Sequence, residues 1–150
     1  MSLLALVPRL EGDDGRVHDE LLTALAADYE TVASGEGWVM VRARGGGVGG
    51  QRIEIHRIRA FDEPWLAVIA EIADAAHLGG DAALRHNATL AYGAIATREG
   101  YAILRAALSV ASLTGPVLLR AVRALAEEAT YLRAQAPPPS AKDLFLSYVD

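Results

Sequence analysis

Residues 38–58 read WVMVRARGGGVGGQRIEIHRI, and the predicted fold depends on how this stretch is interpreted. The run 38–44 is rich in β-branched and aromatic residues, and the run 51–58 contains alternating polar and apolar residues. Both patterns are typical of strands. Five of the six residues between the runs are glycine, a composition that favours turns, so the stretch predicts a β-hairpin.

The start of the first predicted strand is apolar on both of its faces. Trp38 and Met40 alternate with Val39 and Val41, so the two pairs of side chains face opposite sides of the sheet. If the valines belong to the core, an exposed Trp38 and Met40 form a patch that suits a bound peptide. The other interpretation is a sheet covered on both faces by helices of the same chain.

A second hairpin is predicted from residues 92–97 and 101–110, with Arg98-Glu99-Gly100 as its turn. The segment 64–73 is ambiguous, because its apolar residues fit one face of a strand and one face of a helix equally well. We favour a strand over this segment, since it is rich in β-branched residues and the first hairpin needs a further strand to complete a sheet.

Amphipathic helices are predicted at three places. The first covers 17–29, and a short second helix over 82–91 follows the turn at Gly79-Gly80-Asp81. The third begins at Thr114, a helix-capping residue, and ends before the three prolines at 137–139. Its apolar stripe contains Leu118, Val122, Leu125, Ala129 and Leu132.

The predicted order is helix, three strands, helix, two strands, helix. This order indicates an α+β fold in a single domain, with an antiparallel sheet packed against helices. We expect residues 1–136 to form the domain and residues 137–150 to form an apolar tail behind a stiff proline spacer.

Composition excludes several classes of function. The 150-residue chain carries a net charge of −5, which disfavours nucleic-acid binding because phosphate contacts need clustered basic residues. It has no cysteine, so disulfides, thiolate nucleophiles and cysteine metal ligands are excluded. The apolar run at 2–7 is too short for a signal core or a membrane span, and we therefore expect a cytoplasmic protein that does not bind membranes.

No motif in the chain points clearly to catalysis. Gly45, Gly47 and Gly50 match the glycine spacing of a dinucleotide site, but a strand follows them where that site needs a helix. Glu54 and His56 share one face of a predicted strand and are the best candidates for a small-ligand site. We expect no catalytic residue, no metal ligand and no cofactor.

The chain resembles the class I type III secretion chaperones, the Tir-chaperone or CesT group, and the related YbjN proteins. The residues that carry the resemblance are LRHNATL at 84–90, YGAIA at 92–96, GYAILR at 100–105 and LLRAV at 118–122. They are similar to the short helix, the closing hairpin and the last amphipathic helix of those families, whose common order is α-β-β-β-α-β-β-α.

The resemblance implies a homodimer that binds an extended segment of a client protein or peptide along the first helix and the first sheet edge. Candidate client contacts are Leu21, Leu25, Trp38 and Met40, and candidate dimer contacts are Leu84, Leu90, Tyr92 and Ile103. The leading hypothesis is a dimeric chaperone or adaptor without catalytic activity. The alternatives are a YbjN-like regulatory module and a small-ligand-binding domain around Glu54 and His56.

Overall fold

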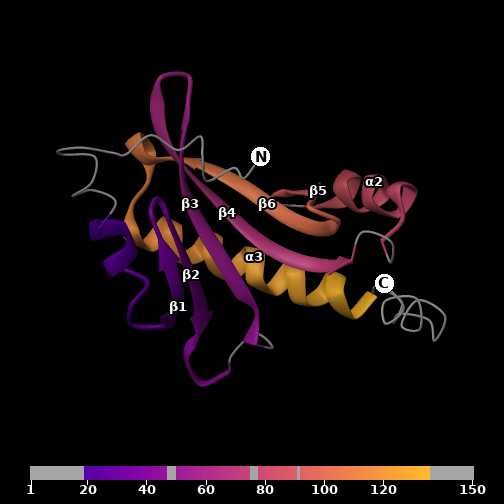
Figure 1. The fold of residues 1–150 in the computed structure, drawn as a ribbon, viewed down its shortest axis with the longest axis horizontal. Coiled ribbons are helices and arrows are strands. Elements are labelled where there is room, and N and C mark those ends of the chain that lie inside the picture. Colours follow the sequence, from indigo (N-terminus) through magenta and orange to yellow (C-terminus); the bar gives the residue numbers. More distant parts are fainter. Residues whose placement is uncertain (1–18, 47–49, 75–77, 91, 136–150) are drawn as a thin grey trace.

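The computed structural model describes residues 19–46, 50–74, 78–90 and 92–135. A single antiparallel sheet of six strands runs through the molecule in the order β1-β2-β3-β4-β6-β5 (Figure 1). The strands are β1 (Tyr29–Gly35), β2 (Trp38–Ala43), β3 (Arg52–Ala60), β4 (Glu63–Asp74), β5 (Ala94–Arg98) and β6 (Tyr101–Ser109). The helices with full bounds are α2 (Gly80–Thr89) and α3 (Gly115–Gln135), and residues 19–23 are also helical. The predicted α+β class and both predicted hairpins are confirmed.

The central strand β4 settles the ambiguity over residues 64–73 in favour of a strand. It pairs with β3 on one side and with β6 on the other. All five side chains from Leu66 to Ala70 are buried, whichever face of the sheet they point to. A strand that is buried on both faces has a continuous apolar run rather than an alternating one, and for this reason its periodicity was uninformative.

Strand β1 differs from the prediction, in which the first helix reaches residue 29 and residues 30–35 belong to no element. Helical backbone ends at Thr23, turns follow, and Tyr29 already pairs with Ala43 as the first residue of β1. Thr31 to Gly35 are exposed, so the strand has no alternation of buried and exposed residues that a pattern search could find.

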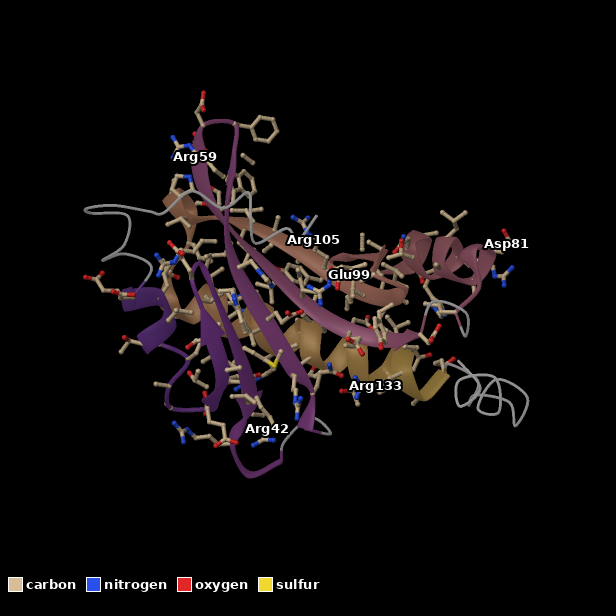
Figure 2. All side chains as sticks on the ribbon, viewed as in Figure 1. Arg42, Arg59, Asp81, Glu99, Arg105 and Arg133 are labelled. Atoms are coloured by element: carbon tan, nitrogen blue, oxygen red, sulfur yellow. The ribbon has the colours of Figure 1, made fainter. Side chains whose placement is uncertain are left out.

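Helix α3 covers one face of the sheet and lies behind the strands in Figure 1. The predicted apolar stripe is buried along its whole length, from Leu118 to Leu132. Thr114 caps the helix as expected, since its Oγ1 accepts a hydrogen bond from the Val117 amide at 3.4 Å. At the other end, the Arg133 guanidinium donates to the carbonyl oxygens of Glu71 at 3.1 Å and Ile72 at 3.4 Å, which ties the last turn to β4 (Figure 2).

We predict that Leu125→Ala lowers the free energy of unfolding by about 2–5 kcal/mol, because Leu125 is fully buried and its loss leaves a cavity under the sheet. Glu127→Ala, on the exposed side of the same helix, is the control and should change stability by no more than about 0.5 kcal/mol. Urea unfolding followed by circular dichroism measures both. Equal effects of the two substitutions would contradict this account of the core.

Helix α2 contacts β5, although none of its side chains is fully buried. Asn87 makes the connection: its Oδ1 accepts from the Ile95 amide at 2.6 Å, and its Nδ2 donates to the Ile95 carbonyl at 3.2 Å. The side-chain amide therefore pairs with Ile95 as the peptide group of a further strand would. It occupies the outward polar groups of Ile95 on the last strand of the sheet.

Replacing Asn87 by Ala should cost about 1–3 kcal/mol of unfolding free energy, because two partly buried backbone groups lose their partners. Amide hydrogen exchange at Ile95 should accelerate in the same variant. Arg85→Ala, an exposed position of the same helix, should leave that amide unchanged. Undiminished protection of Ile95 in the Asn87 variant would show that α2 is held by other contacts.

Candidate partner-binding surface

The outer edge of β1 is the candidate site for a partner. β1 stands last in the strand order, and within the described part of the chain no strand pairs with its outer side. The strand is exposed from Thr31 to Gly35, with a register shift between Thr31 and Ala33. Open strand edges present unpaired N–H and C=O groups and can pair with another extended chain.

Trp38 extends the candidate site onto the face of the sheet that α3 does not cover. Val39 and Val41 point into the core, so the alternation places Trp38 and Met40 on the opposite face, where both are half-buried. The Trp38 ring lies directly over Gly35 of β1: a Cβ built on Gly35 would stand 2.3 Å from the indole Nε1. The absence of a side chain at Gly35 thus lets the indole reach across β1 toward the open edge.

The core-facing side of β1 has a small hollow of 120 Å³. It lies between the first helical segment and the sheet, and Arg44 stands beside it. Its apolar lining includes Leu22, Leu25, Tyr29 and Val39. An added strand would therefore find an aromatic ring above the sheet and a partly apolar hollow below it, on the two sides to which its alternating side chains point.

Glu54 and His56 form part of a polar network on the same face as Trp38. His56 Nε2 lies 3.6 Å from Glu54 Oε1, and the Arg98 guanidinium donates to Glu54 Oε2 at 2.5 Å. Arg98 belongs to β5, so its side chain reaches Glu54 over the two strands between β5 and β3. His56 stacks loosely with Trp38, with ring centroids 6.3 Å apart, which links the network to the candidate site.

The electrostatics of Glu54 fit a structural ion pair. Its contact with His56, together with the Arg98 guanidinium, holds the pKa of the carboxyl below its ordinary value of 4.5, although burial acts in the opposite direction. A carboxylate that is ionised and already paired with an arginine is a poor proton acceptor. Among the residues described, no group of three or more metal-ligating side chains lies together.

The other predicted site residues range from buried to exposed. Leu21 and Leu25 are 5% and 2% exposed, because the apolar side of their helical segment packs into the core. Among the predicted dimer contacts, Leu84 is 68% exposed on α2, Leu90 and Tyr92 are half-buried, and Ile103 is buried in the sheet. The apolar tail predicted at 137–150 lies outside the described residues.

Known structures provide a comparison for this arrangement, whereas no protein-family model and no curated protein matches the chain by sequence. The crystal structure of the ExsC–ExsE complex contains a chain that is 14% identical, with a TM-score of 0.58, over 87% of this chain and 100% of that one. The fold is similar to that of the class I type III secretion chaperones. This part of the predicted resemblance is confirmed at the level of fold, whereas the resemblance to the YbjN proteins stays a prediction. In the described part of the chain, no helix is both long enough and apolar enough to cross a membrane.

We predict that Glu54→Gln lowers the free energy of unfolding by about 1–3 kcal/mol at pH 7, because Arg98 loses its charged partner in a partly buried site. The folded-state pKa of Glu54 lies below 4.5, so the ion pair stabilises the fold above that pH and is lost as the pH falls through the lowered pKa. The difference between wild type and variant should therefore shrink at pH 3.5.

Urea unfolding at the two pH values tests this expectation, and Glu99→Gln on the exposed β5–β6 turn is the control. A difference that is the same at both pH values would mean that the charge of Glu54 contributes nothing.

Proposed function

We propose that this protein is a dimeric, non-catalytic chaperone or adaptor that holds an extended segment of another polypeptide along the open edge of β1. The observation that carries the proposal is the asymmetry of the sheet. Asn87 occupies the outward groups of Ile95 on β5, whereas β1 is exposed and no strand pairs with its outer edge among the described residues. The similar structure noted above is a complex of two proteins, which agrees with a partner-binding role for this fold.

The energetics of such binding come from two sources. Each backbone hydrogen bond formed along β1 contributes about 0.5–1.5 kcal/mol net, and these bonds do not depend on the client's sequence. Selectivity then comes from side chains that point alternately to the two faces. One set would meet Trp38 over Gly35 and the other the hollow beside Leu25 and Tyr29. We therefore expect clients with apolar residues at alternate positions.

A dimer is part of the proposal because α2 leaves apolar surface uncovered. Leu84 is exposed, and Leu90 and Tyr92 are only half-buried. A second copy that covers these residues would stabilise a helix that has no fully buried side chain of its own.

The candidate clients to test are the products of the genes adjacent to its own, each co-expressed with this protein. A true client should bind at a fixed ratio and become resistant to proteolysis. Hydrogen exchange of the complex should show slower exchange at the amides of 29–35 and no change at 94–98. If no neighbouring product binds, or if protection appears only outside β1, the proposal fails.

Trp38→Ala should weaken binding of that client by at least tenfold, because the indole is the largest apolar group beside the edge. Gly35→Ala should act in the same direction, since its new Cβ displaces the indole while every backbone group of β1 remains. Tyr131→Ala on α3, an exposed aromatic residue remote from β1 in sequence, is the control. Isothermal titration calorimetry measures all three variants, and unchanged affinity in both β1–β2 variants would remove Trp38 from the binding site.

A second candidate function is supported by one observation, a hollow of 320 Å³ beside Met40. Gln51 lines it, and the buried amide oxygen of this residue has no hydrogen-bond partner among the described residues. Glu54 lines the same hollow. If a ligand is found, Glu54→Ala combined with His56→Ala should weaken its binding. Unchanged binding in this double variant would exclude the alternative.

A further inference from the structure

The β3–β4 hairpin carries an exposed aromatic side chain at its tip. The hairpin projects beyond the rest of the sheet at the top of Figure 1. Ala60 pairs with Glu63, so the turn consists of Phe61 and Asp62 alone. Phe61 is 88% exposed, the largest exposed fraction among the large apolar side chains described.

The backbone at this tip is unfavourable for the residues that occupy it. Phe61 and Asp62 have φ angles of 53° and 59°, the left-handed conformation that a two-residue hairpin turn requires. Asn-Gly suits this turn, whereas a bulky residue in the left-handed region costs about 1–2 kcal/mol. Neither burial in the core nor backbone preference therefore explains why a phenylalanine occupies position 61. Strain of this kind is often retained where a side chain serves a function.

The tip is also held in place. The rings of Phe61 and Trp65 lie 6.4 Å apart at an angle of 57°, and the Arg59 guanidinium donates to the Asp62 carbonyl at 2.6 Å. Arg59 stands on the projecting arm of the hairpin (Figure 2). Phe61 is thus presented in a defined position, which lowers the entropy lost when a partner binds it.

A socket of suitable size lies elsewhere on the same chain. A hollow of 220 Å³, lined almost entirely by apolar surface, lies between the start of α3 and the end of β6. An apolar cavity of about 150 Å³ is sufficient for a benzene molecule, so a phenyl ring fits. The lining residues are Tyr92, Leu108, Val117, Arg120, Ala121 and Ala124.

One polar group of the socket matches the tip. Arg120 is exposed at the socket, and the residue next to Phe61 is the acid Asp62. The Asp62 carboxylate, which arrives with the phenyl ring, would form a charge-assisted hydrogen bond with the Arg120 guanidinium.

The positions of tip and socket allow a closed pair. Leu108 of the socket pairs with Leu66, which lies five residues from Phe61 along the hairpin arm. At about 3.4 Å per residue, the tip stands roughly 17 Å from the level of the socket. If insertion is reciprocal across a two-fold axis, each tip enters the other's socket and the assembly closes as a pair, whereas one-way insertion would produce an open chain.

We infer that Phe61 of each protomer inserts into the socket of a second copy, with Asp62 against Arg120. The inference rests on the homodimer in the proposed function and identifies one of its contacts. Tyr92, a predicted dimer contact, becomes part of the receiving surface.

Sedimentation equilibrium of three variants of the full chain tests the inference. Phe61→Asn removes the inserted phenyl ring, here called the knob, and Val117→Glu places a charge in the socket. Each substitution should raise the dimer dissociation constant at least tenfold. Glu99→Asn is the matched control, because Glu99 has the same left-handed backbone, with φ of 51°, in the β5–β6 turn. Phe61→Asn and Glu99→Asn should both raise the melting temperature of the monomer, since asparagine suits this conformation, but only the former should weaken the dimer.

A mixture of the first two variants gives the sharpest result. Phe61→Asn keeps an intact socket and Val117→Glu keeps an intact knob, so the two should bind each other more tightly than either binds itself. A dimer indifferent to both variants overturns the inference and leaves the rest of the dimer proposal standing. A dimer weakened by Val117→Glu alone also overturns it, because the socket then holds something other than Phe61. A protein that stays monomeric overturns both this contact and the dimer, while client binding is judged by the separate exchange experiment.

Discussion

Leu118, Val122 and Leu125 of α3 exclude water from one face of the central strand β4, and the rest of the structure depends on this packing. β4 holds the two halves of the sheet together, since it pairs with both β3 and β6. A strand in this position must be apolar on both faces, and its side chains from Leu66 to Ala70 are all buried. Because α3 is the only long helix described, the opposite face of the sheet is left for polar networks and half-buried aromatic rings.

The two ends of the sheet are treated differently, and the proposed function follows from this difference. At β5, a side-chain amide pairs with the outward groups of Ile95. At β1, residues 31–35 are exposed and no such pairing is seen among the described residues. Gly35 leaves room for Trp38 to lie across this strand. On the face that α3 does not cover, the Glu54–Arg98 ion pair joins β5 to β3 over the two strands between them.

Much of this fold could be predicted from sequence because its signals are local. A glycine-rich turn predicted the first hairpin and a turn ending in Gly100 predicted the second, while the stripe from Leu118 to Leu132 with a Thr114 cap predicted α3. β1 could not be found this way, since an exposed edge strand has no buried face to impose a period. For β4 the difficulty was the opposite one, a strand buried on both faces.

The candidate site was predictable only in part, for a related reason. The alternation in β2 indicated that Trp38 and Met40 oppose the valines, and the structure places them so. That Leu21 and Leu25 pack into the core depends on where the helical segment meets the sheet, which is a property of tertiary structure. Phe61 gave no signal at all, because a single aromatic residue in a turn becomes notable only when its backbone angles and exposure are known.

The pairing of Asn87 with Ile95 also limits how copies of this chain can aggregate. A protein with two free sheet edges can add copies indefinitely, as in a fibril, since every addition renews the exposed edge. Here the Asn87 amide occupies the outward groups of Ile95, so an incoming strand meets an obstacle on β5 that it does not meet on β1. Sheet-to-sheet growth is therefore disfavoured at one end of the sheet, which reduces the hazard of leaving β1 exposed at the other.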